Sequence, residues 1–198
     1  MSVFNLKEQN SNLDNKIVAG LERISQVFKT LLWEKSKQYN LSPIQIQLLI
    51  FINYHSQNKS TISYLAQEFN VSKPTVSDTI KTLEQKGFIK KNIDKTDTRS
   101  YTISLTKTGE KIVSETDDFA NPFTEIISNS EKSEKNILWK NISEIIIQLN
   151  KLQVISVQRT CFNCKHFSKK NEGSFCNLLN QKLETKDIRI DCLEFNQN

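Results

Sequence analysis

The feature that most constrains this chain is a pair of short helical patterns in residues 61–88, "TISYLAQEFNVSKPTVSDTIKTLEQKGF", with a tight turn between them. In each pattern, apolar residues recur every three or four positions, which is the spacing of one helical face. Two short helices joined in this way predict a helix-turn-helix. The apolar positions are Ile62, Leu65, Ala66 and Phe69 in the first helix, and Val76, Ile80 and Leu83 in the second.

The residues of the turn support this prediction. Asn70 tolerates the left-handed backbone conformation that closes a helix, and Val71 can fill the turn. Ser72, followed two residues later by Pro74, is typical of a helix start. Gly87 is then expected to stop the second helix.

The second helix is polar on its other face, which carries Pro74, Ser77, Asp78, Lys81 and Gln85. The second helix of a helix-turn-helix lies in the major groove of DNA, with its N-terminal residues against base edges and phosphates. The alternative is a helical hairpin packed inside a core, because helix pairs are common.

A strand hairpin is predicted next, since Tyr101, Ile103 and Leu105 alternate with polar residues at a period of two. The charged loop before them holds Arg99, and a planar guanidinium suits the narrow minor groove of A·T-rich DNA. Asp97 either holds this guanidinium in place or forms an ordinary surface pair with it.

The distribution of charge is more informative than the total. The formal net charge is +5, yet residues 73–111 alone hold nine basic residues against five acidic ones. A phosphate backbone is the natural partner of such a segment if the fold presents it on one face. A solvated basic surface is the alternative.

From Ser42 to Gly109 the chain resembles the winged helix of the multiple antibiotic resistance regulator (MarR) family. The resemblance rests on the order of its motifs: "LSPIQIQLLIFI", the helix pair, "KPTVSDTIKTLEQKGFI", the D-x-R of Asp97-Thr98-Arg99, and "LTKTG". Weaker motifs extend it to residues 13–158, where the family has long terminal helices that build a dimer.

The resemblance implies a set of DNA-contacting residues and three kinds of partner. The partners are double-stranded DNA, a second copy of the chain, and a small-molecule effector between the dimer helices and the winged helix; nothing in the sequence identifies that effector. Asp78 departs from the resemblance, because many relatives carry arginine at this position. The implied residues are Ser72, Lys73, Pro74, Thr75, Ser77, Asp78 and Lys81 on the reading helix and Arg99 at the wing tip.

Helical patterns flank this region on both sides. Ser42-Pro43-Ile44-Gln45 is a capping box with proline at the first helical position, and an amphipathic helix is predicted over Ile17–Leu32. Thr106 can cap a helix after the wing, which Asn121-Pro122 bends or ends. From Ser130 a last helix carries a heptad seam that can pack within the chain or, as the resemblance favours, in a two-fold dimer: Leu138, Ile142, Ile145, Leu149 and Leu152.

All cysteines lie in the last forty residues, at Cys161, Cys164, Cys176 and Cys192. The few apolar residues around them cannot form an ample core, and a metal can supply the missing folding energy. Four thiolates suit tetrahedral Zn2+, the metal we expect, and they also suit an iron–sulfur cluster. A thiol redox switch or chemically inert cysteines would fit the same residues. His166 and Asp191 are expected to flank the ligands without binding metal.

We therefore expect a mainly α-helical fold with a small β-hairpin wing, flanked by long dimerisation helices and followed by a small Cys-rich, metal-bound tail. The expected domains are an N-terminal dimerisation helix (1–40), the winged helix-turn-helix (41–109), C-terminal dimerisation helices (110–158) and the four-cysteine module (159–198).

The expected function is that of a homodimeric, sequence-specific transcriptional regulator on palindromic DNA, modulated by a small ligand or by the metal centre. The alternative is a protein-binding winged-helix scaffold with a zinc-stapled docking tail. No paired base and nucleophile appears, so an enzyme is not expected. A chain without a leader or an apolar run of about 20 residues is expected to be cytoplasmic and not membrane-bound. That reducing compartment favours metal or redox chemistry over disulfides.

Overall fold

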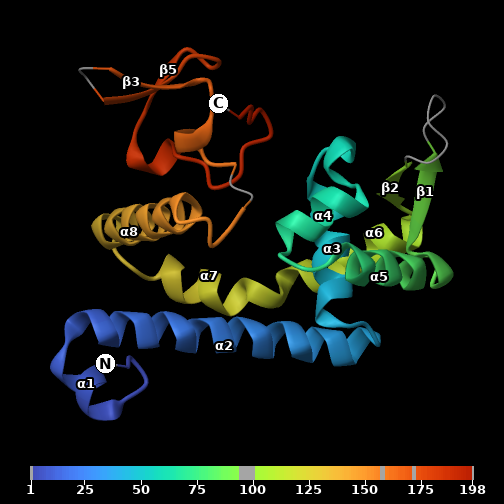
Figure 1. The fold of residues 1–198 in the computed structure, drawn as a ribbon, viewed down its shortest axis with the longest axis horizontal. Coiled ribbons are helices and arrows are strands. Elements are labelled where there is room, and N and C mark those ends of the chain that lie inside the picture. Colours follow the sequence, from blue (N-terminus) through green and yellow to red (C-terminus); the bar gives the residue numbers. More distant parts are fainter. Residues whose placement is uncertain (1, 94–100, 157–158, 171–172, 198) are drawn as a thin grey trace.

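The computed structural model describes residues 2–93, 101–156, 159–170 and 173–197 (Figure 1). Two small antiparallel sheets accompany the helices: β1 (Ile89–Ile93) with β2 (Tyr101–Leu105), and β3 (Phe167–Lys170), β4 (Gly173–Cys176) and β5 (Gln181–Leu183) in that order. The helices are α1 (Leu6–Ser11), α2 (Leu13–Tyr39), α3 (Pro43–Tyr54), α4 (Ile62–Glu68), α5 (Lys73–Gln85), α6 (Lys107–Thr116), α7 (Asn121–Ser128) and α8 (Lys132–Lys151).

The central unit comprises α3 to α6 with the β1–β2 hairpin, and it holds the main core. β1 and β2 pair in register from Ile89 opposite Leu105 to Ile93 opposite Tyr101. The amide of Ile103 also donates to the carbonyl of Ser60, which ties the hairpin to the segment before α4. The fully buried side chains include Ile46, Leu48, Leu49, Leu65, Val76, Ile80, Leu83 and Ile103.

The turn between α4 and α5 forms as its residues predict. Asn70 has a φ of 51°, in the left-handed region, and Val71 packs against the core. The Ser72 hydroxyl accepts from the amide of Thr75, which caps α5. Gly87, just beyond the helix, has a φ of 74° that favours glycine. The predicted capping box of Ser42 and Gln45 at the start of α3 is confirmed as well.

At Gly109 the backbone of Phe88 approaches α6 too closely to leave room for a side chain. A Cβ atom there would sit 2.0 Å from the carbonyl oxygen of Phe88. That oxygen is held in place because it accepts a hydrogen bond from the amide of Thr106, at 3.0 Å. The glycine of "LTKTG" is therefore required by the junction between the wing and α6.

The flanking helices run along one another (Figure 1). Phe28 of α2 stacks on Phe123 of α7 with ring centroids 4.0 Å apart, and Lys35 of α2 forms a 2.7 Å ion pair with Asp118. The helix capped by Thr106 ends at Thr116, before the expected break at Asn121-Pro122. Pro122 instead stands at the start of α7, because proline fits the first helical turn, where its missing N–H is not needed.

Helix α8 has two unlike faces. Ser143 and Ile147 are buried, and Trp139 donates through Nε1 to the carbonyl of Thr185, so this face packs on the C-terminal residues. The predicted heptad seam lies on another face. Its residues Leu138, Ile145, Leu149 and Leu152 are between 37% and 72% exposed in the single chain. The helix itself ends at Lys151, with Leu152 as its cap.

The tail is a small three-stranded sheet with connecting turns, lying over α8 (Figure 1). Its strands were not expected from the sequence. Its buried apolar residues are Cys164, Leu183 and Ile188, a small core for a separate unit. In the part of the chain that the structure describes, no helix is long and apolar enough to cross a membrane.

Candidate nucleic-acid interface

Helix α5 buries one face and exposes the other. Val76, Ile80 and Leu83 are completely buried in the core, which fixes the rotation of the helix. The predicted DNA-reading residues all lie on its exposed side or at its capped N-terminus. They are Ser72, Lys73, Pro74, Thr75, Ser77, Asp78 and Lys81.

The N-terminus of α5 is rigidly capped. The Ser72 hydroxyl lies 3.2 Å from the Thr75 amide and 2.8 Å from the Thr75 hydroxyl, so these two side chains hold each other. Lys73 remains exposed beside the cap. A helix N-terminus favours anions because of its dipole, and the exposed Lys73 adds a positive charge at this end. The capped end of α5 is thus suited to a phosphate.

Not every basic residue of the segment is free to meet DNA. Lys91 pairs with Glu84 at 2.6 Å, and Lys86 donates to the carbonyl of Asn40 at 2.7 Å. Lys81, by contrast, makes no ion pair among the described residues, and its side chain is exposed. Arg99 and Asp97 lie outside the described residues, so the predicted wing-tip contact stays a prediction.

The four cysteines of the tail converge on one small cavity of about 20 Å³. Cys161, Cys164, Cys176 and Cys192 all line it, and His166 lines it as well, among apolar side chains. The sheet explains part of this convergence, because Cys176 stands opposite Phe167 in the β3–β4 register. Such a cavity has room for about one water-sized particle.

Two hydrogen-bond donors of Arg189 point at sulfur atoms of this cluster. The Arg189 amide lies 3.3 Å from the Sγ of Cys161, and Nη1 of its guanidinium lies 3.5 Å from the Sγ of Cys192. One residue thereby bridges cysteines that are far apart in the sequence.

The thiols influence one another electrostatically. Burial raises the pKa of the Cys161 thiol, the Arg189 amide partly opposes that rise, and nearby Cys192 and Cys176 add to it. All four thiols are free of disulfides. Among the described residues, no three His, Cys, Asp or Glu side chains already stand in a metal-ligating arrangement.

Arg159, at the start of the tail, joins the tail to the central unit. Its guanidinium donates to both carboxylate oxygens of Asp191, at 2.5 and 2.6 Å. It also donates to both carboxylate oxygens of Glu68 at the end of α4, and at 2.8 Å to the hydroxyl of Tyr64. With only 6% of its surface exposed, Arg159 is a buried cation between two carboxylates.

The charges of this cluster stabilise one another. Burial alone would lower the pKa of Arg159, but its hydrogen bonds to Asp191 and Glu68 raise it above the usual value. Burial would likewise raise the pKa of Asp191, yet hydrogen bonds from Arg159 and His55 outweigh burial and lower it. Removing Arg159 would leave the carboxylates of Glu68 and Asp191 without their shared cation.

Aromatic residues of α3 and α4 lie close to the guanidinium of Arg159. Its central carbon lies 5.5 Å from the ring centroid of Phe51 and 5.9 Å from that of Tyr64. His55 stacks on Phe51, and its Nε2 lies 2.8 Å from Asp191. The tail is therefore in contact with both α3 and α4.

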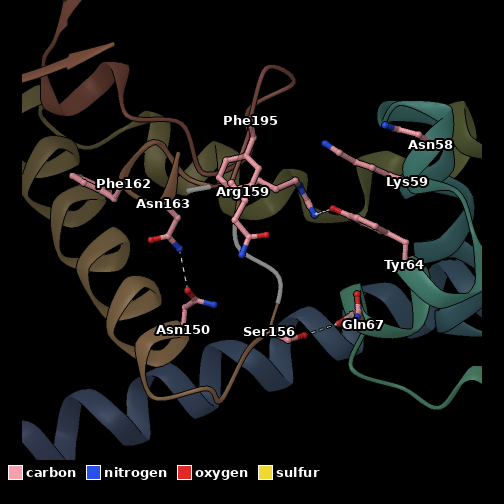
Figure 2. Close-up of a pocket in the computed structure, with 11 residues that line it drawn as sticks. Asn58, Lys59, Tyr64, Gln67, Asn150, Ser156, Arg159, Phe162, Asn163 and Phe195 are labelled. Carbon is pink, nitrogen blue, oxygen red and sulfur yellow. Dashed lines mark hydrogen bonds between the residues drawn. The ribbon is translucent and has the colours of Figure 1, made fainter. Parts of the chain in front are cut away.

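Beside Arg159 opens a cleft of about 780 Å³ between α4, the end of α8 and the tail (Figure 2). Two hydrogen bonds between described residues join its sides. Ser156 donates to the carbonyl of Gln67 at 3.4 Å, and Asn163 of the tail donates to Asn150 of α8 at 3.0 Å. The Arg159 cluster is the connection that pairs charges.

Sequence reasoning found the cysteines but missed Arg159, Glu68 and His55. Asp191, which was expected to flank the metal ligands, stands next to Cys192, and its side chain bonds to Arg159 and His55. One signal was available. The chain has four arginines among 27 basic residues, and Arg159 and Arg189 both stand within three residues of a cysteine.

Part of the chain is similar in sequence to known proteins. A family model described as "MarR family" matches residues 39–100. The "uncharacterized HTH-type transcriptional regulator YwaE" of Bacillus subtilis (strain 168) is 37% identical over 75 residues, which are 37% of this chain and 44% of YwaE. The chain thus spans less than half the length of this curated relative.

Two solved structures of MepR from S. aureus extend the likeness to the fold. The MepR–DNA complex is 26% identical, covering 67% of this chain and 97% of MepR, with a TM-score of 0.58. MepR in its DNA-binding conformation is 25% identical, with coverages of 67% and 98% and a TM-score of 0.59. The chain is therefore similar over residues 39–100 to the MarR family, and it has a winged helix-turn-helix fold similar to that of MepR.

Proposed function

We propose that this protein binds double-stranded DNA sequence-specifically and regulates transcription as a homodimer on a palindromic site. The observation that carries the proposal is α5, whose apolar face is locked in the core while its polar N-terminal half stays exposed. The solved MepR–DNA complex is similar in fold and supports the same use of the helix. Because the relatives are helix-turn-helix proteins, they do not favour the protein-binding scaffold.

The exposed apolar faces of the flanking helices support a homodimer. Along α2, Ile17, Val18, Leu21, Ile24, Val27 and Phe28 are each about 40–50% exposed, and the seam of α8 is exposed as well. Isolated chains rarely leave apolar stripes this long in water. A two-fold dimer would cover them and place two copies of α5 about one DNA turn apart.

An effector site of the kind that the resemblance implies would lie between a dimer helix and the winged helix. A cleft of about 570 Å³ occupies that position between α2 and the start of α3. Trp33 lines it and is 55% exposed, so its ring is accessible from solvent. We propose this cleft as the effector site.

Selection from a random-sequence duplex pool tests the proposed function directly. Enrichment of a palindrome with half-sites about one helical turn apart would support a dimeric reader of DNA. Uniform recovery of all sequences, at a salt-dependent but sequence-independent affinity, would refute sequence-specific regulation.

Lys81→Ala should weaken binding to every duplex, since Lys81 is exposed on the reading helix and has no ion-pair partner among the described residues. Losing one phosphate contact should lower the slope of log K against log salt by about one unit. Titration at several salt concentrations measures this slope. Lys132→Ala, which removes the same charge at the start of α8, is the control and should leave the slope unchanged. An unchanged slope for Lys81→Ala would place that residue off the interface.

A further inference from the structure

Arg159, Asp191 and Glu68 together hold the tail against the central unit, and we call them the clamp. Two of them, Arg159 and Asp191, stand close to cysteines of the tail in the sequence. Arg159 stands two residues before Cys161, and Asp191 immediately precedes Cys192. Their backbones also form a parallel bridge, Arg159 with Asp191. The shape of the cysteine cluster and the position of the clamp are therefore parts of one local structure.

We infer that the four cysteines bind a single Zn2+, and that this metal holds the tail in the shape that clamps α4 through Arg159. Metal content would then set the affinity of the winged helix for DNA. The zinc site is argued from the tail alone, whereas the effect of the metal on DNA binding rests on the proposed function.

Two observations and the chemistry of zinc support a mononuclear thiolate centre. All four cysteines line one cavity of about 20 Å³, so they are placed to share one bound ion. Among the described residues of the tail, the buried apolar ones are Cys164, Leu183 and Ile188, so packing alone stabilises it weakly. Tetrahedral zinc takes four thiolates, and its binding energy becomes folding energy.

Binding would form four Sγ–Zn bonds and break the four S–H bonds, with the four protons released to solvent. The resulting centre carries a net charge of −2. Arg189 is placed to offset it, because its amide faces the Sγ of Cys161 and its guanidinium faces the Sγ of Cys192. Donors of this kind around the ligands orient the thiolates and stabilise their charge. The thiols do not yet stand as a ligand set, so we expect the ion to draw them together around the cavity.

The clamp connects this centre to the reading helix in three steps. Asp191, next to Cys192, holds the guanidinium of Arg159, and that guanidinium holds Glu68 at the end of α4. α4 packs directly on α5 through the common core of Leu65 and Val76. The structure in which Arg159 holds Glu68 is similar in fold, over 67% of the chain, to MepR in its complex with DNA, so we expect this arrangement of α4 and α5 to be the one that binds DNA. Loss of the metal should therefore weaken DNA binding.

Elemental analysis of the full chain, purified without oxygen, tests the metal site. We expect about one Zn2+ per chain in colourless protein, and almost none in Cys176→Ser. His166→Ala should keep its zinc, because the four cysteines complete the coordination. Iron with acid-labile sulfide, an absence of metal, or loss of zinc from His166→Ala would each overturn the four-cysteine zinc site.

Glu68→Ala tests the clamp separately from the metal. This variant should retain zinc but lose affinity for the selected duplex by about tenfold or more, as should Cys176→Ser. Glu110→Ala, an exposed acidic residue of α6, is the matched control and should bind like the parent. If Glu68→Ala and Cys176→Ser bind DNA as tightly as the parent, metal content does not control binding.

Amide hydrogen exchange gives a readout that needs no DNA. Loss of zinc in Cys176→Ser should speed exchange in the tail and in α4, while Glu68→Ala should speed it in α4 alone. Unchanged exchange in α4 would refute the clamp. If the parent binds no duplex at all, the proposed function fails, but the zinc and exchange results still decide the site and the clamp.

Discussion

Ile145→Asp together with Leu149→Asp is expected to abolish the homodimer, leaving monomers or aggregates. Both side chains belong to the exposed seam of α8, opposite the face on which Ser143 and Ile147 pack against the tail. In the dimer that we propose, the two aspartates would be buried without partners, which costs several kcal/mol. Light scattering coupled to size-exclusion chromatography measures the mass of the particle.

The control for this prediction is a double variant on another side of the same helix, and it changes the net charge by more than the Ile145 and Leu149 variant does. Lys140→Asp with Lys151→Asp places two aspartates at exposed positions that the 3.6-residue period sets away from the seam. This variant should remain a dimer. A compact dimer of the Ile145 and Leu149 double variant would show that the seam is not the interface.

Gly109→Ala is expected to destabilise the winged helix strongly. The added Cβ would stand 2.0 Å from the carbonyl oxygen of Phe88, and that carbonyl cannot retreat without breaking its hydrogen bond with the Thr106 amide. Overpacking against fixed backbone should lower the free energy of unfolding by about 3 kcal/mol. Chemical denaturation followed by circular dichroism measures the loss.

Thr108→Ala is the matched control, since Thr108 is the exposed residue beside Gly109 in α6. Its free energy of unfolding should change by no more than about 0.5 kcal/mol. If Gly109→Ala were as stable as Thr108→Ala, the close approach of Phe88 would not constrain this position.

Features that depend on neighbouring residues could be predicted from the sequence. The left-handed Asn70, the Ser72 cap and the capping box at Ser42 follow from the conformations and hydrogen bonds that these residues favour, and the structure confirms them. The buried face of α5 was predictable because helical spacing places Val76, Ile80 and Leu83 on one side. Pro122 was placed in the wrong role, because proline is compatible with both the end of one helix and the start of the next.

The strands of the tail were not predictable in the same way. Lys169, Lys170, Gly173 and Ser174 show no alternation of apolar and polar residues, and they pair because β4 meets strands on both sides. The convergence of the cysteines on one cavity also depends on this pairing.

The sequence by itself determined the helix-turn-helix, because its turn, its cap and its apolar faces all depend on residues within a few positions of one another. Only the tertiary structure decided that the four-cysteine tail would meet α4. Arg159 and Glu68 are 91 residues apart, and each alone resembles an ordinary surface charge. Their pairing requires Asp191, Tyr64 and Phe51 to be assembled around the guanidinium by the fold, since a buried charge is tolerated only where its partners are already in place.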